Sequence, residues 1–216
     1  MSGTRKELLQ EIYARLSAFF GPQRWWPAET PFEVILGAVL TQNTSWKNVA
    51  AAIGNLRRSD LLIFENLCRL DAREVAVLVR PSGFYNEKAK KIKTFCNHIL
   101  TKWGGDLEEF LAQDLGSLRS ELLSIRGIGP ETADSIILYA AFKPSFVVDT
   151  YTYRIFSRHE WVEESISYED LREYFMGGLD EDVSFFQEFH ALLVRTGHLY
   201  CRKKALCRSC PLNTYL

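Results

Sequence analysis

The clearest chemical signal in the chain is a pair of glycines in a tight turn between two helical stretches. Gly127 and Gly129 flank the apolar Ile128, and Pro130 opens the next stretch. Proline suits the first position of a helix because the amide that it lacks would have no partner there. Glycines leave the backbone amides of a turn accessible, and the following helix adds the positive end of its dipole. The turn is therefore predicted to bind an anion such as a phosphodiester, without needing a lysine or arginine.

An ordinary helical hairpin with a glycine-rich turn is the simpler interpretation of a Gly-x-Gly sequence. Here Leu122 and Ile125 precede the turn, and Thr132-Ala133 begin a second apolar helix. This flanking pattern is typical of the DNA-binding helix-hairpin-helix and favours it over the simpler interpretation.

A second candidate is a single acidic residue at a predicted helix start. Asp149 directly follows the apolar run Phe146-Val147-Val148. By itself, an aspartate in this place is most simply a helix N-cap.

The elements that must position these residues are helices. Apolar residues recur at intervals of three and four, which predicts helices, over 8–20, 32–40, 49–56, 72–78, 89–99, 118–123, 133–142, 151–156, 168–175 and 185–198. Glycines and prolines mark the breaks. Only residues 145–148 resemble a strand, and they are too few and too isolated to form a sheet. The predicted fold class is all-α.

Composition sets the outer limits. The 216 residues, 47% of them hydrophobic, suffice for one domain or two small intertwined ones. No apolar run reaches the roughly 18 residues that span a membrane. The first residues form an amphipathic pattern that includes acids, unlike a signal or transit peptide. We therefore expect a protein of the cytoplasm, associated with the nucleoid, with reduced thiols.

The net charge of −1 does not by itself favour a nucleic-acid partner, since such proteins are often basic. Basic residues gather in segments 88–93 and 202–204. A solvated helix face is the commoner explanation of either cluster, so charge does not decide between the functions.

Together, the hairpin and segment 146–154 resemble the signature of the helix-hairpin-helix–GPD superfamily of DNA glycosylases, in its endonuclease III branch. Segments 36–44, 82–89 and 197–201 also match this family, in order and at its spacing. The resemblance implies two helical lobes with the active-site cleft between them. Residues 25–142 would form the middle lobe, ending in the helix-hairpin-helix. The N-terminal helix, 1–24, would join 143–216 and its cysteine-rich loop in the other lobe.

The resemblance gives Asp149 a catalytic role. In this family the matching aspartate faces the flipped nucleotide, where positive charge develops on the deoxyribose as the base departs. A fixed carboxylate stabilises that cation and can orient or deprotonate the attacking water. Bifunctional members carry a lysine two residues beyond the second hairpin glycine, where this chain has Glu131. Glutamate cannot form a Schiff base. Lys88 or another lysine could substitute, but no spacing supports this, so we expect a monofunctional enzyme that leaves an abasic site.

The base pocket is expected to contain tryptophan. Core packing is the usual role of buried tryptophan, but Trp25, Trp26, Pro27 and Trp46 together look closest to the endonuclease III-like 3-methyladenine DNA glycosylases. An N-alkylated purine such as 3-methyladenine is cationic, so indole faces attract it more than a normal base. The resemblance therefore implies excision of alkylated purines.

Duplex DNA with a damaged base is the implied partner, bound by a monomer without membrane involvement. A flipped base leaves a hole that must be filled. By resemblance Gln42 is the polar plug and Phe84 the apolar wedge, although Phe84 could equally be a core residue at a turn. Lys88 is a candidate phosphate contact. The hairpin contacts are expected from Gly127, Ile128, Gly129, Glu131 and Thr132.

Cys201, Cys207 and Cys210 resemble the loop that holds a 4Fe–4S cluster in this branch. Such a cluster ordinarily needs four thiolates, and the expected fourth position falls at Leu216 or beyond. A non-cysteine fourth ligand, a relic loop and a zinc site remain alternatives. Cys68 and Cys96 look like ordinary buried small residues. We expect a structural cluster with three candidate ligands and no identified fourth.

Three functions stay open at this point. The first is the alkylpurine glycosylase. The second is a relative acting on mismatched adenine, thymine or an oxidised pyrimidine, or a bifunctional glycosylase and lyase; the tryptophan pair and the absent lysine argue against the oxidised-pyrimidine lyase. The third is a non-enzymatic binder of DNA structure, against which Asp149 argues.

Overall fold

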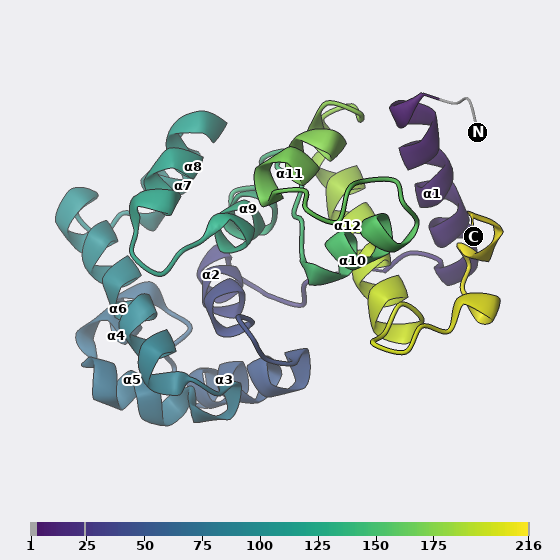
Figure 1. Ribbon diagram of the computed structural model, residues 1–216. Coiled ribbons are helices and arrows are strands. Elements are labelled where there is room, and N and C mark those ends of the chain that lie inside the picture. Colours follow the sequence, from purple (N-terminus) through teal and green to yellow (C-terminus); the bar gives the residue numbers. More distant parts are fainter. Residues whose placement is uncertain (1–3, 24, 216) are drawn as a thin grey trace. The chain divides into compact units, whose positions relative to one another are not determined.

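The computed structural model describes residues 4–23 and 25–215, so Arg24 and Leu216 lie outside the described residues. All regular structure within these ranges is helical (Figure 1), and the predicted all-α class is confirmed. The chain divides into two compact units. One contains residues 28–143, and the other combines the described residues up to Pro27 with those from Pro144 onwards.

The unit of residues 28–143 is built around one buried helix. Its helices are α2 (Pro31–Leu40), α3 (Trp46–Arg58), α4 (Phe64–Arg69), α5 (Ala72–Leu78), α6 (Tyr85–Lys102), α7 (Leu107–Ala112), α8 (Leu115–Ser124) and α9 (Pro130–Tyr139), with a 3₁₀ turn η1 at Arg80–Ser82. Every residue of α2 from Phe32 to Leu40 is buried. Its one charged residue, Glu33, pairs with Arg57 at 2.7 Å, and α2 packs against α3, α6 and α9, as expected for a core helix.

The other unit places α12 at its centre. It contains α1 (Arg5–Phe20), α10 (Thr150–Arg158), α11 (Tyr168–Met176), α12 (Val183–Leu199) and the 3₁₀ turns η2 (Cys207–Ser209) and η3 (Asn213–Tyr215). Helix α12 packs against α10 and α1, which lies beside it in Figure 1. The core is aromatic: the Phe146 and Phe175 rings stack at 3.9 Å, and Phe189 meets both edge-on.

Segment 145–148 is extended but pairs with no strand in the described part of the chain. Its four side chains are buried, and the Phe146 amide donates to Met176 Sδ at 3.3 Å. This buried segment fixes where Asp149, the next residue, begins helix α10.

Two helices were not predicted, α4 and α7. Each has six residues, too few for an apolar repeat to show in the sequence. Helix α9 ends at Tyr139, before the predicted end at Phe142, which adopts a left-handed backbone at φ 50°.

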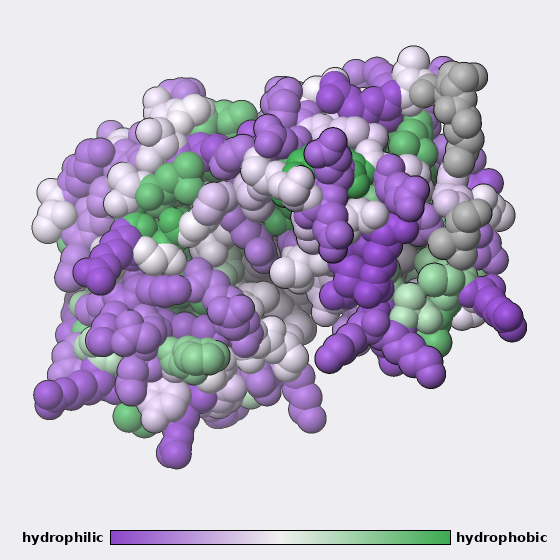
Figure 2. All heavy atoms as spheres, viewed as in Figure 1, coloured by the Kyte–Doolittle hydropathy of each residue, from purple (hydrophilic) through white to green (hydrophobic). Residues whose placement is uncertain are grey.

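No described helix is long and apolar enough to cross a membrane. The face in Figure 2 is mainly hydrophilic, with apolar side chains visible only in scattered places.

Candidate DNA-binding and catalytic site

The hairpin between α8 and α9 has the geometry of an anion-binding turn. Gly127 adopts φ +99°, a conformation that favours glycine. Gly129 is the N-cap of α9, with Pro130 at the first helical position. Within the described residues, the amides of Gly127 and Gly129 have no hydrogen-bond partner. The turn therefore presents free N–H donors at the positive end of a helix.

The structure gives Ile128 a different role from the predicted DNA contact. Its side chain is 5% exposed, and its amide donates to the Ile125 carbonyl at 3.0 Å. Neither group is left to meet DNA, so the prediction is wrong for this residue. Ile128 instead anchors the turn in the core and leaves the flanking glycines outside.

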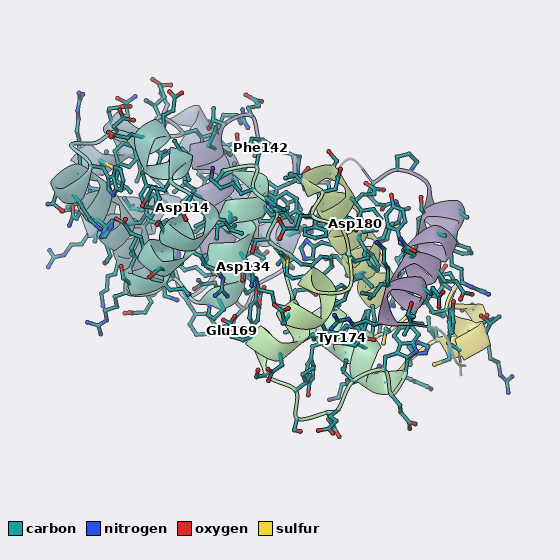
Figure 3. The ribbon with its side chains drawn as sticks, turned by 90° about the horizontal axis from the view of Figure 1, so that it is seen from above. Asp114, Asp134, Phe142, Glu169, Tyr174 and Asp180 are labelled. Carbon is teal, nitrogen blue, oxygen red and sulfur yellow. The ribbon has the colours of Figure 1, made fainter. Side chains whose placement is uncertain are left out.

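An ion pair ties together the two helices of the hairpin. Arg119 of α8 donates to both carboxylate oxygens of Asp134 on α9, at 2.9 and 3.1 Å. Asp134, labelled in Figure 3, is completely buried, so its charge needs such a partner. This two-pronged contact fixes the angle between the helices and therefore the shape of the turn.

Gln42, the predicted plug, lies against the hairpin. Its Nε2 donates to Thr132 Oγ1 at 2.9 Å and to the Gly127 carbonyl at 3.3 Å. Its Oε1 accepts a hydrogen bond from Lys91 Nζ. The structure thus brings Gln42, Gly127 and Thr132 together, as expected for one DNA-binding surface, and adds Lys91, which the sequence did not single out.

Lys88, the predicted phosphate contact, is buried, and that prediction is wrong. The residue is 2% exposed, and its ammonium donates to the carbonyls of Leu40 at 2.8 Å and Ser82 at 2.7 Å. Burial lowers the pKa of Lys88, and the neighbouring charge of Lys91 lowers it further. Lys88 ties the end of α2 to the turn before α6 and cannot reach a phosphate.

Phe84 stands at the start of α6 with its side chain 72% exposed. This exposure excludes the alternative that it is a core residue. Its left-handed backbone, at φ 45°, is costly for an aromatic residue, and such strain tends to occur at functional sites. The predicted wedge role is compatible with both features and stays a prediction.

Asp149 is the N-cap of α10. Its Oδ1 accepts a hydrogen bond from the Thr152 amide at 2.7 Å. The second oxygen has no hydrogen-bond partner among the described residues, and the side chain is half-buried. The capping contact therefore holds a carboxylate in place with one oxygen available for chemistry.

His190 accompanies Asp149, and no motif in the sequence indicated it. It lies on α12 and is 4% exposed. Burial lowers the pKa of His190, while the negative charge of Asp149 opposes that change. The imidazole thus lies in the same unit as the carboxylate and within range of its charge.

The tryptophans of the predicted base pocket belong to different units. Trp25 and Trp26 are half-buried and Pro27 is exposed, in the unit that includes the C-terminus. Trp46, also half-buried, begins α3 in the other unit. Their joint pocket stays a prediction.

The three C-terminal cysteines line one cavity of about 210 Å³ with His159 and Arg158. Burial raises the pKa of Cys210, and the neighbouring thiols raise it further. The three cysteines thus border the same cavity. Among the described residues, however, no three His, Cys, Asp or Glu side chains converge as a metal-binding group. The position expected for a fourth ligand, Leu216, lies outside them.

Comparison with known proteins identifies the class of molecule as a DNA glycosylase. The model of the HhH-GPD superfamily base excision DNA repair proteins matches residues 36–181. The chain is 46% identical to a Methanocaldococcus jannaschii protein provisionally named a DNA repair glycosylase, and the match covers all of this chain and 98% of that one. It is 28% identical to endonuclease III of Sulfolobus acidocaldarius, over 85% of this chain and 80% of that one.

Solved structures of DNA repair enzymes also match most of the chain. The Helicobacter pylori 3-methyladenine DNA glycosylase bound to 1,N6-ethenoadenine is 30% identical, with a TM-score of 0.77 over 91% of this chain and 98% of that one. A trapped endonuclease III–DNA covalent intermediate has a TM-score of 0.83 at 20% identity, over 97% and 94% of the two chains, which establishes the fold. The chain belongs to the HhH-GPD superfamily of base excision DNA repair proteins, as an endonuclease III-like glycosylase.

Proposed function

We propose that this DNA glycosylase is monofunctional: it hydrolyses the N-glycosidic bond of alkylated purines such as 3-methyladenine and leaves an abasic site. The observation that carries the proposal is the carboxylate of Asp149, held through one oxygen by the Thr152 amide at 2.7 Å with the other oxygen available.

The chemistry follows from that fixed charge. As the bond between C1′ and the base nitrogen breaks, its electron pair leaves with the base and the sugar becomes cationic. Asp149 stabilises this cation by charge, at no cost in reorganisation because its position is already set. Water then bonds to C1′ and gives a proton to the carboxylate. A cationic alkylpurine departs as a neutral base, so the reaction needs no separate acid.

Glu131 supports hydrolysis rather than strand cleavage. It is exposed near the start of α9, where lyase chemistry would require an amine. Lys88, the lysine considered as a substitute, is 2% exposed and inaccessible to a sugar.

The substrate class rests on Trp25, Trp26, Pro27 and Trp46. Indole faces favour a cationic purine over a normal base. The 30% identical Helicobacter pylori glycosylase is named for 3-methyladenine and holds a modified purine, which supports the same class here.

Duplex DNA would be held by the glycines of the hairpin together with Glu131 at the start of α9, while Thr132, which is 6% exposed, would act by holding Gln42 through its hydroxyl. Gln42 and Phe84 would fill the space that the flipped nucleotide vacates. We propose that the monomer suffices for this.

The test is to incubate the purified protein with methylated duplex DNA and to identify released bases by chromatography. We expect 3-methyladenine in solution, strand breaks only after alkali, and no borohydride-trapped complex with DNA. Trapping or direct strand cleavage would contradict the monofunctional mechanism.

Parallel duplexes carrying mismatched adenine, mismatched thymine or an oxidised pyrimidine test the substrate class. Release of one of these bases in place of alkylpurines would overturn the proposed substrate class.

We further propose that Cys201, Cys207 and Cys210 hold three corners of a structural 4Fe–4S cluster, which would stabilise the C-terminal loop and take no part in hydrolysis. Purified protein should show a broad visible absorbance, with iron and sulfide in equal amounts, and Cys207→Ser should lose both. Bound zinc, or no metal at all, would contradict this proposal.

A further inference from the structure

Lys91 lies on the hairpin itself, although it comes from helix α6. Its side-chain stem covers Gly127 so closely that a Cβ there would be 2.5 Å from Lys91 Cγ. Its ammonium donates to Gln42 Oε1, and the amide of Gln42 in turn donates to Thr132 and to the Gly127 carbonyl. The positive charge is thus held beside the free amides of the turn.

This charge is not neutralised by the protein. No described carboxylate lies within ion-pair distance of the Lys91 ammonium. The nearby Glu87 forms its ion pair with Lys90, at 2.6 Å. A half-buried ammonium that is bonded to a neutral amide, on a side chain that packs against this turn, is suited to an anion as its next partner.

We propose that Lys91 is a further DNA-binding residue, whose ammonium joins the hairpin amides in binding one phosphodiester while its bond to Gln42 aligns that side chain with the same surface. This inference rests on the proposed role of the hairpin in binding DNA. It revises the expectation that the turn binds a phosphate without any basic side chain.

Lysine 91 also explains why a nearly neutral chain can hold DNA here. Backbone amides carry partial charges, which release few counterions from DNA. A full positive charge at the phosphate releases about one, so it gives a salt dependence that amides alone do not.

The test measures binding to a duplex with a stable abasic-site analogue over a range of salt concentrations. Lys91→Met keeps the stem over Gly127 and removes the charge. It should make the slope of log K against log salt less negative by about 0.9. Lys91→Arg should restore the slope of the parent. Lys90→Met is the matched control, since Lys90 is exposed and pairs with Glu87. It should leave the slope unchanged. Thermal unfolding checks that each variant folds, and Lys91→Gln replaces Lys91→Met if the latter does not.

A separate variant tests the hairpin. A Cβ at Gly129 meets no atom within 4 Å, and aspartate suits an N-cap. Gly129→Asp should therefore fold well but repel the phosphate and weaken binding relative to the parent. If Gly129→Asp weakens binding but Lys91→Met behaves like Lys90→Met, the inference about Lys91 fails alone. If Gly129→Asp binds like the parent, the hairpin itself is not the DNA site and both proposals fail.

Discussion

Asp149 shows how one residue can serve structure and chemistry together. A carboxylate with two oxygens can cap a helix with the first and act on a substrate with the second. Capping removes the side-chain freedom that a catalytic group would otherwise lose at the moment of reaction. The two interpretations of this residue are therefore not alternatives, because the cap is what fixes the charge.

The substitution Asp149→Asn separates the two tasks. Asparagine caps helices about as well as aspartate, so the unfolding temperature should hardly change and DNA binding should persist. Loss of the negative charge should lower single-turnover base release by at least about a hundredfold. Asp182→Asn is the control, because Asp182 caps α12 in the same way, through the Phe185 amide at 2.7 Å. Full activity in Asp149→Asn would remove the basis of the proposed mechanism.

At the residue scale, the sequence predicted what depends on local pattern. The glycines of the hairpin and the aspartate at a helix start are local features, and both stand where expected. Lys88 was mistaken for a surface residue because its partners, the carbonyls of Leu40 and Ser82, meet it only in the fold. His190 was missed for the same reason, since its proximity to Asp149 depends on the packing of α12 against α10.

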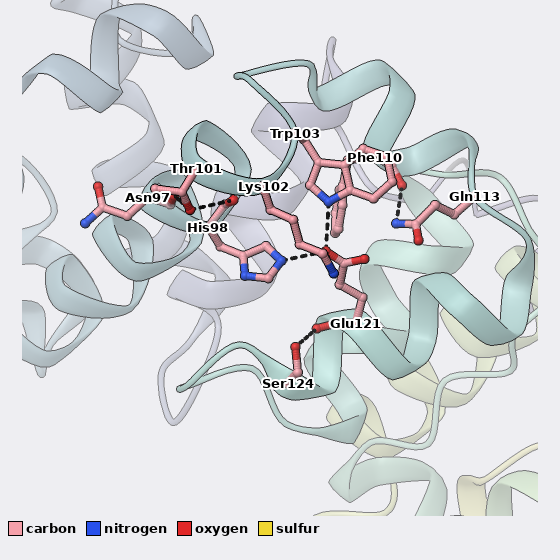
Figure 4. A network of polar contacts seen from close by, with 9 residues as sticks. All are labelled: Asn97, His98, Thr101, Lys102, Trp103, Phe110, Gln113, Glu121 and Ser124. Carbon is pink, nitrogen blue, oxygen red and sulfur yellow. Dashed lines mark hydrogen bonds and ion pairs between the residues drawn. The ribbon is translucent and has the colours of Figure 1, made fainter.

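Among the elements, α6 and α8 are joined by one carboxylate whose side chain is 9% exposed. Glu121 of α8 accepts hydrogen bonds from His98 at 2.7 Å and Trp103 at 2.8 Å, and pairs with Lys102 at 2.9 Å (Figure 4). These contacts outweigh the opposing effect of burial and lower the pKa of Glu121 from 4.5 to about 2. The network anchors the first helix of the hairpin to the long helix that carries Lys91.

Glu121→Gln should weaken that junction. A pKa lowered this far corresponds to about 3 kcal/mol of folding free energy. The ordinary pKa lies above the folded one, so this stability is fully present above about pH 4.5 and is lost as the pH falls towards 2. Urea denaturation should show that the variant loses a similar amount of unfolding free energy at pH 7. Between pH 4.5 and 2 its stability should fall less steeply than that of the parent. Glu87→Gln is the control, since Glu87 is exposed and its loss should change stability little. Equal stability in both variants would refute the anchoring role.

Helices α10 and α12 approach closely because Gly197 has no side chain. A Cβ there would lie 2.4 to 2.6 Å from three atoms of Tyr151. Gly197→Ala should therefore destabilise the protein by about 1–3 kcal/mol despite the better helix propensity of alanine. It should also slow base release by displacing the helix that holds Asp149. Gly54→Ala in α3 is the control: its Cβ meets only the flexible end of Arg58, at 3.5 Å, so stability should stay level or rise. A fully stable Gly197→Ala would show that this approach is not required.

At the element scale, apolar periodicity predicted the long helices because each buries one face or all of its surface. Helix α5 has the predicted bounds, and α2 differs by one residue. The six-residue helices α4 and α7 had no comparable signal, since each is too short for an apolar repeat to show.

For the whole molecule, the net charge of −1 was a poor guide to the partner. Charge acts over about 8–10 Å at physiological salt, so the groups around a phosphate matter more than the sum over 216 residues. Some of these charges form ion pairs, as in Arg57–Glu33 and Arg119–Asp134. Lys91 has no ion pair within the described residues, so its positive charge remains beside the hairpin of a nearly neutral protein.

The stability of the whole protein should depend on pH through two imidazoles, His190, which is buried, and His159, which is half-buried. Burial lowers the pKa of His190, opposed by the charge of Asp149, and burial lowers that of His159, opposed by the Tyr215 carbonyl. In the unfolded chain both titrate near pH 6.5. The unfolded state then binds more protons than the folded state as the solution is acidified, so the stability due to neutral imidazole is complete above about pH 6.5 and falls below it.

Unfolding free energies measured from pH 8 to 5 should decline in this window, separately from the Glu121 window below pH 4.5. His190→Gln should reduce the decline, whereas His198→Gln, at an exposed position of α12, should not. An unchanged decline in His190→Gln would mean that its imidazole is equally protonated in both states, and that the negative charge of Asp149 compensates for burial in full.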